Sequence, residues 1–187
     1  MESYIIMSHT KKYILTSITL GTIAAISAGL ITLTYLATHK KIDENNTLEF
    51  EKGITAIFKD YQYDSVAEVE GVNFGESKTA KACYKVQNGE SLVGYVLKSE
   101  GSNSYGKITM LSGFKAETFD FISIHLISNE QSYASTLQKK YINPIKEGEK
   151  DIYSTEQTSC GATRGAELVQ SMVLDAQYLV NLNFGSK

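Results

Sequence analysis

The chain has 187 residues, enough for one domain with additional segments. Its formal net charge is -3, so the chain lacks the excess of basic residues that is typical of nucleic-acid-binding proteins. We therefore expect no nucleic-acid partner. The chain has two cysteines, Cys83 and Cys160, which are too few for a disulfide framework. A single disulfide between them is an alternative if the domain lies outside the cytoplasm.

An uncharged apolar segment runs from Tyr13 to Thr38. As a helix it would be roughly 39 Å long, more than the hydrocarbon core of a bilayer, which is about 30 Å thick. A cleavable signal peptide has a shorter apolar region and a small-x-small cleavage site, which the end of this segment lacks. A buried soluble helix would not be uncharged over such a length. We therefore expect a short tail at 1–12 and a single transmembrane helix at 13–38, in contact with membrane lipid.

Positive residues flank this segment on both sides, so their distribution does not define which end is cytoplasmic. One side of the expected helix carries small residues, which favour close packing with other membrane helices. These residues are Gly21, Ala24, Ala25, Ala28 and Gly29.

Residues 39–49 are polar and predict a linker, and residues 50–187 predict one folded domain. Apolar side chains recur at helical spacing from Phe50 to Tyr61. Asn88-Gly89 is typical of a hairpin turn between two strands. Four segments rich in β-branched and aromatic residues predict strands at Thr79–Val86, Ser91–Lys98, Lys107–Phe114 and Phe119–Ser128.

Two further helices are predicted, at 131–142 and at 166–182, and Pro144 and Gly148 predict a loop between them. The soluble order is therefore helix, four strands, helix, loop, helix. This order predicts an α+β fold with an antiparallel sheet packed with helices, preceded by one N-terminal transmembrane helix.

A short segment of small residues precedes the last helix and carries the chemistry. The first amides of a helix lack internal partners and carry the positive end of its dipole, so such a place binds phosphate. Gly161 and Ala162 let a ligand approach the backbone, and Thr163 adds a hydroxyl. Arg164 adds a charge-assisted contact to a phosphate oxygen. The alternative is that Thr163 serves only as the N-cap of the helix.

Cys160-Gly161-Ala162-Thr163, followed by an apolar helix, resembles the S/T-G-A-T motif of the FMN-binding domain family. Its members include the G subunit of the Rnf electron transport complex and the C subunit of the sodium-translocating NADH:quinone reductase. Two further segments resemble the family's G-Y-V and G-Y-G-G-x-I patterns, namely Gly94-Tyr95-Val96 and Ser104-Tyr105-Gly106-Lys107-Ile108-Thr109. The strand Phe121 to Glu130 is similar to the one leading into the family's H-x-E-T segment. The N-terminal anchor also fits, and the chain length is closer to the Rnf G subunit.

The resemblance implies FMN attached through its phosphate, as a phosphoester, to Thr163. A hydroxyl is a poor nucleophile without a base, and the family relies on a separate flavin transferase that uses FAD and a divalent metal. The resemblance places further contacts of the flavin at Tyr105, Gly106 and Glu130, besides Cys160, Gly161, Ala162 and Arg164 of the motif itself.

The resemblance also implies the role of the chain. It predicts an electron-carrying subunit of a membrane-bound, ion-translocating Rnf-type complex rather than a stand-alone enzyme, with the chemistry supplied by the cofactor. Its partners would be the other membrane subunits. The localisation would be the cell membrane, with the C-terminal domain outside the cytoplasm.

The chain departs from the family pattern in five places, and these departures define the alternatives. One is the H-x-E-T-P-G-type segment, which is reduced here to Ser128-Asn129-Glu130-Gln131-Ser132-Tyr133. Gln157 stands where an Asp is usual, Cys160 and Gly165 where Ser or Thr is usual, and Lys107 where a second Gly is usual. They favour a second hypothesis, a flavin-free structural or assembly subunit of the same fold. A third hypothesis is a cysteine-dependent enzyme that pairs Cys160 with His125, because a helix N-terminus lowers the pKa of a thiol.

Overall fold

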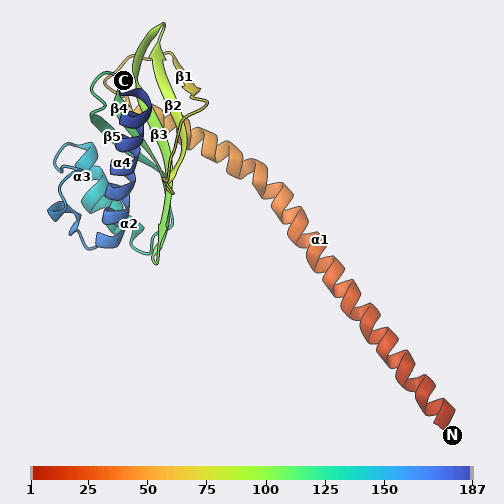
Figure 1. Ribbon diagram of the computed structural model, residues 1–187. Helices are drawn as coiled ribbons and strands as arrows, with labels where there is room; N and C mark the ends of the chain where they lie inside the picture. Colours follow the sequence, from red (N-terminus) through yellow and green to blue (C-terminus); the bar gives the residue numbers. More distant parts are fainter. Residues whose placement is uncertain (1, 186–187) are drawn as a thin grey trace. The chain divides into compact units, whose positions relative to one another are not determined.

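The computed structural model describes residues 2–185, and the chain divides after Thr47 into two compact units (Figure 1). Helix α1 (Glu2–Ile57) supplies the described part of the first unit and the first element of the second. Residues 39–49, where the sequence predicted a linker, have a helical backbone within α1. The helix predicted to reach Tyr61 ends at Ile57.

One stretch of α1, Tyr13–Tyr35, is long and apolar enough to cross a membrane, with a mean hydropathy of 1.9 and none of it buried. At 23 residues it would span roughly 35 Å, so it covers a hydrocarbon core of about 30 Å. Its large side chains are open to the surroundings, as Leu15 and Ile31 show at 67% and 69% exposure. Length and composition fit a single-pass anchor or a signal sequence.

Four threonine hydroxyls in this stretch donate to the backbone carbonyl one turn earlier. Thr19 donates to Leu15 over 2.8 Å, and Thr22 donates to Ile18 over 2.9 Å. A hydroxyl that donates its hydrogen bond to a carbonyl of its own helix needs no water molecule as a partner. These threonines are therefore compatible with a lipid environment.

The second unit is built on a five-stranded antiparallel sheet in the order β1-β2-β3-β4-β5. The strands are β1 (Ser65–Glu68), β2 (Ala80–Asn88), β3 (Ser91–Asn103), β4 (Gly106–Lys115) and β5 (Phe121–Asn129). Every strand pairs with its neighbour in sequence, which confirms the predicted antiparallel sheet. The four predicted strands correspond to β2–β5, and the short edge strand β1 was not predicted.

The predicted hairpin between β2 and β3 is present, but its turn lies one residue later than Asn88-Gly89. Asn88 pairs with Ser91, so Gly89 and Glu90 are the two central residues. Gly89 has a φ of +60°, and no other residue of this turn has a positive φ. Glycine at the first central position is the requirement of a type II′ turn, which matches the twist of the strands.

One face of the sheet is covered by α4 (Thr163–Phe184), which lies against the strands in Figure 1. Alternate strand residues such as Leu97, Met110 and Ile124 are buried there. They form one apolar cluster with Val169 and Met172 of α4. The short helical segments α2 (Ala134–Leu137), η1 (Gln138–Ile142) and α3 (Asn143–Lys146) belong to the same cluster.

The opposite face of the sheet is covered by the end of α1. Ile54, Ile57 and Phe58 pack there in a second cluster with Val96 and Leu111, and all five side chains are at most 2% exposed. The residues of β3 and β4 beneath them include glycine: a Cβ on Gly113 would overlap Cγ2 of Ile57. The central strands β3 and β4 are therefore covered on both faces, and each carries a run of consecutive buried residues.

Two helix boundaries differ from the prediction. Pro144 was predicted to mark a loop, but it lies in the first turn of α3. α3 follows the π-helical segment η1 without a break, since the backbone of Ile142 between them is helical. The last helix begins at Thr163 rather than Ala166, after the 3₁₀ turn η2 (Glu156–Thr158).

Candidate functional site

The tip of the β3–β4 hairpin is fixed against the start of α4 by Asn103. Its amide nitrogen donates to the carbonyl of Arg164 over 3.0 Å, and its amide oxygen accepts from the backbone N–H of Tyr105 over 2.8 Å. One side chain therefore joins the first turn of α4 to the residue at the tip of the hairpin. Tyr105 itself remains 43% exposed.

The segment that follows β5 closes against the same tip. The backbone N–H of Ser132 donates to the carbonyl of Tyr105 over 2.9 Å, and that of Glu130 donates to Lys107 over 2.9 Å. The buried side chain of Gln131 donates from its amide nitrogen to the carbonyl of Gly106.

Gly106 is required where these two segments approach each other. Its φ is +135°, and a Cβ there would overlap the carbonyl oxygen of Glu130. Any other residue would be strained by its backbone conformation and would push the two segments apart. The close approach gives Gly106 a structural role, and its predicted contact with the flavin stays a prediction.

Helix α4 begins without a side-chain cap. Ala162 occupies the N-cap position, and it offers no hydrogen-bonding side chain. Its carbonyl accepts from the amides of Gly165 and Ala166. Thr163 is the first helical residue, so the alternative that it is the N-cap is wrong. Among the described residues, no group accepts from the amides of Thr163 and Arg164 or bonds to the Thr163 hydroxyl.

A pocket of about 220 Å³ lies where these three segments meet. It is lined by the hairpin tip, by the segment after β5 with α2, and by the start of α4. The lining residues are Tyr105, Gln131, Tyr133, Leu137, Gly161, Ala162, Thr163, Arg164 and Gly165. Free amides, a half-buried hydroxyl and the positive end of a 22-residue helix therefore face one opening.

Five of the eight residues predicted from the sequence line this pocket, namely Tyr105, Gly161, Ala162, Thr163 and Arg164. Cys160 is buried behind it in the apolar cluster, and Glu130 is exposed beside it. Sequence reasoning missed Gln131, Tyr133 and Leu137. These residues follow Glu130, the last residue of the segment from Phe121 that resembles the family. Their position in sequence was therefore the available indication that they belong to the pocket.

Arg164 also has an alternative partner. Its guanidinium lies 3.0 Å from the carboxylate of Glu167, one turn along α4, and both side chains are well exposed. An exposed pair of this kind contributes on the order of 0.5 kcal/mol or less, so it would not hold Arg164 away from a bound anion.

Two departures from the family pattern have visible structural consequences. Gln157 accepts from the backbone N–H of Asp151 over 2.8 Å, so its side chain is used to fix the loop before α4 and does not line the pocket. Gly165 is buried, and a Cβ there would lie 3.0 Å from a methyl of Leu137 and 3.4 Å from Oε1 of Gln131. The smaller residue lets α2 pack closely on the first turn of α4.

The cysteine-dependent hypothesis is wrong, because Cys160 and His125 lie on opposite faces of the sheet. Cys160 belongs to the cluster beneath α4, whereas His125 faces Gly53 near the end of α1. Cys83 and Cys160 are both buried and free. Burial raises the pKa of Cys83 to about 12, so this thiol stays protonated and unreactive at neutral pH.

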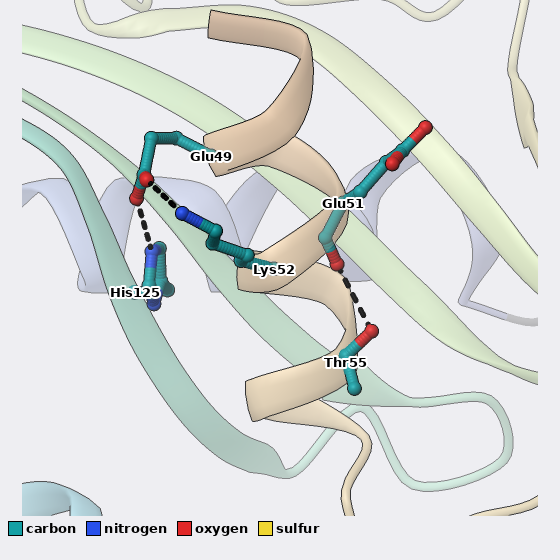
Figure 2. Close-up of polar contacts among 5 residues, drawn as sticks. All are labelled: Glu49, Glu51, Lys52, Thr55 and His125. Carbon is teal, nitrogen blue, oxygen red and sulfur yellow. Dashed lines mark hydrogen bonds and ion pairs between the residues drawn. The ribbon is translucent and has the colours of Figure 1, made fainter. Parts of the chain in front are cut away.

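His125 faces a small polar group on α1 (Figure 2). Its Nε2 lies 3.6 Å from Glu49, beyond hydrogen-bonding distance, and Glu49 is 2.7 Å from Lys52. Burial lowers the pKa of His125, and the charge of Lys146 lowers it further, while Glu49 acts in the opposite sense. His125 is therefore neutral at neutral pH, and its ring nitrogens have no hydrogen-bond partner among the described residues.

Residues 7–56 match the family described as RnfG N-terminal region. This range contains the apolar stretch of α1 and the turns of α1 that cover the sheet. The chain is an RnfG-type protein. No curated protein matches it. Membership of the RnfG family implies a subunit of an Rnf complex, with other Rnf subunits as partners.

RnfG-type proteins typically carry FMN, and the pocket can be tested for its fit to that group. The matched range ends before the pocket, so the test rests on the pocket's own residues. Gly161 has a φ of +84°, and beyond its Cα only a methyl of Thr136 lies within 4 Å. An anion can therefore approach the backbone of this loop closely. The unbonded hydroxyl of Thr163 and the free amides of the first turn suit a phosphate, so the residues present fit the phosphate end of FMN.

Proposed function

We propose that this RnfG-type subunit carries FMN, joined through a phosphoester to Thr163, and transfers electrons within a membrane-bound, ion-translocating Rnf complex. One observation carries the proposal. The Thr163 hydroxyl is accessible and without a hydrogen-bond partner among the described residues, and it opens into a pocket at the uncapped start of α4. The bound flavin would supply reversible electron transfer, and the chain acts as a carrier subunit rather than as a stand-alone enzyme.

The chain's own residues have three roles toward the phosphate. The amides of Thr163 and Arg164 hold its oxygens at the positive end of α4. The guanidinium of Arg164 adds a charge-assisted contact once it leaves Glu167. Gly161, which has no side chain and is exposed, leaves the backbone of this loop open to approach.

The attachment needs help from outside the chain. A threonine hydroxyl is a weak nucleophile unless a base takes its proton. The described residues that line the pocket include no aspartate, glutamate or histidine. We therefore assign the base, with the FAD donor and a divalent metal, to a separate flavin transferase. The new bond joins Thr163 Oγ1 to phosphorus, the hydroxyl proton goes to the base, and AMP leaves.

The apolar stretch Tyr13–Tyr35 would anchor the subunit in the cell membrane, in contact with lipid and with the other subunits. The flavin-bearing unit would lie outside the cytoplasm, as the family resemblance implies. The satisfied threonine hydroxyls of this stretch support an anchor that stays in the bilayer.

A second candidate is a flavin-free structural or assembly subunit of the same fold. Two observations favour it. Gln157 is engaged with Asp151 and cannot supply the carboxylate usual at that position, and Gly165 supplies no hydroxyl. Gly165 lines the pocket and Gln157 lies in the loop before α4, so both changes fall in the segment that a transferase would recognise.

The two candidates are separated by the mass of the full chain purified after co-expression with a flavin transferase. The first candidate predicts a gain equal to FMN less one water, with yellow colour that survives denaturation in acid. Thr163→Val should abolish the gain, and Thr163→Ser should keep it. Thr136→Val is the matched control, because Thr136 lies beside Gly161 with its methyl toward that residue, keeps this methyl in the variant and does not line the pocket. A wild-type chain without the added mass supports the structural subunit instead.

A further inference from the structure

The size of the pocket limits which part of a flavin it can hold. Its volume of about 220 Å³ is below the range of roughly 300–1,000 Å³ that sites for whole small molecules occupy. A phosphate on the Thr163 side would fill the inner part, next to the start of α4. The tricyclic ring of the flavin would then lie at the mouth.

Two tyrosines stand at that mouth. Tyr105 at the hairpin tip and Tyr133 in the segment after β5 both line the pocket, and they are 43% and 56% exposed. Their ring centroids are 6.3 Å apart and their planes are inclined at 54°. Rings inclined in this way cannot both lie flat on one planar ligand, so one supplies a face and the other an edge.

The backbones that carry both rings are fixed to each other. The carbonyl of Tyr105 accepts from the N–H of Ser132 over 2.9 Å and from the hydroxyl of Ser132 over 3.3 Å. The amide of Tyr105 is held by Asn103. The backbone beneath both rings is therefore held in place, while the side chains themselves are largely open to solvent. Less ordering is needed when a ligand arrives, which favours binding.

We propose that Tyr133, together with Tyr105, forms a stacking surface for the isoalloxazine ring of the flavin whose phosphate is held at Thr163. This inference rests on the proposed function, and it adds a ring-positioning residue, Tyr133, to the phosphate site. Leu137 supplies the apolar floor between the ring and the sheet. Edge-to-face and offset contacts between aromatic rings give the surface its affinity.

The test compares the flavin fluorescence of loaded full-length chains in detergent. A tyrosine in contact with a flavin quenches its fluorescence, because an electron passes to the excited ring and then returns. Tyr133→Leu should leave the added mass unchanged and raise the fluorescence per attached flavin roughly two- to tenfold. Tyr105→Leu should act in the same direction. Tyr178→Leu is the matched control: it removes an exposed tyrosine of α4 that does not line the pocket, and it should change neither quantity.

A second measurement keeps this inference independent of the attachment. Thr163→Val is titrated with riboflavin, which has the ring but no phosphate, with and without Tyr133→Leu. The added substitution should raise the Kd for riboflavin about two- to tenfold. A wild-type chain without the added mass overturns the proposed function, and the riboflavin titration then decides the stacking surface alone. Equal fluorescence and equal Kd with and without Tyr133, or no riboflavin binding at all, would overturn the stacking surface.

Discussion

The two faces of the sheet are buried in different ways. On the face beneath the end of α1, here called the closed face, Ile57 and Phe58 press against strand glycines with no room for a Cβ, and a groove of about 500 Å³ lies beside Ile57 at its edge. On the other face the apolar cluster beneath α4 ends in an opening, where Thr163 leaves a hydroxyl and amides without partners. The site therefore lies where close packing stops, and the opposite face has a structural role.

The largest effect is expected for Phe58→Ala on the closed face, which should lower the stability of the fold without changing the site. Phe58 is 1% exposed and its truncation leaves a cavity, so the free energy of unfolding should fall by about 3–5 kcal/mol. Flavin loading of the chain that remains folded should not change. Urea unfolding of the full chain in detergent, followed by tyrosine circular dichroism, measures the loss. Leu92→Ala, at a side chain 37% exposed, should cost far less.

Gly106→Ala tests the open face. The positive φ alone should cost about 1–3 kcal/mol, and the overlap with Glu130 should separate the two segments that carry Tyr105 and Gln131. Flavin loading should therefore drop at least about tenfold, a difference of about 1.4 kcal/mol at the site. The loading is measured by mass. Gly75→Ala is the control, since Gly75 has a φ of +55° but open space around it, and it should keep full loading.

A third test sharpens the comparison through pH. The folded chain keeps His125 neutral at a pH where the unfolded chain binds a proton. Stability should therefore fall as the pH drops below about 6.5, the usual histidine pKa. His125→Leu should remove this part of the decline. Urea midpoints at about pH 7 and pH 5.5 measure the effect, and equal declines in both chains would show that His125 does not contribute.

The decline at lower pH has a different source. The hydrogen bond from Lys52 lowers the pKa of Glu49, so Glu49 contributes stability above its unfolded value that is lost as the pH falls through its folded value. This part should remain in His125→Leu, which separates the two groups on the same face.

The smallest effects are expected at the exposed ion pairs, one on each side of the sheet. Lys52 lies 2.7 Å from Glu49, and Arg164 lies 3.0 Å from Glu167, each pair one turn apart on its helix. Lys52→Gln and Glu167→Gln should each change the free energy of unfolding by less than about 0.5 kcal/mol. Urea midpoints at low and high salt check this, and a loss above about 1 kcal/mol would mean that the pair is structural.

The sequence predicted the sheet well where local composition matched the final environment. β2, β4 and β5 follow their β-branched and aromatic segments closely. The last five residues of β3, Ser99–Asn103, were not predicted because Glu100, Gly101 and Ser102 favour turns. Their pairing with β4 keeps them extended. β1 is four residues long and is specified by its pairing with β2, which no local pattern reveals.

The residues of the pocket at the start of α4 were predictable, whereas Tyr133 and Leu137 were not. Gly161, Ala162 and Thr163 are adjacent in sequence and precede a helix, so a local motif describes them. Tyr133 and Leu137 reach the pocket because the backbone of Ser132 bonds to Tyr105, a contact between segments distant in sequence. Such contacts depend on the register of β4 and β5, which periodicity alone does not define.

The pocket is lined by residues from three segments, around positions 105, 131–137 and 161–165. No one of them alone contains the site, and Asn103 joins the first to the third only when β3 and α4 are both in place. A transferase that recognises the assembled pocket would leave a nascent or misfolded chain unmodified. The attached flavin would then be present only on chains that have completed folding. The flavin-bearing fraction in a cell would therefore measure the yield of folded subunit.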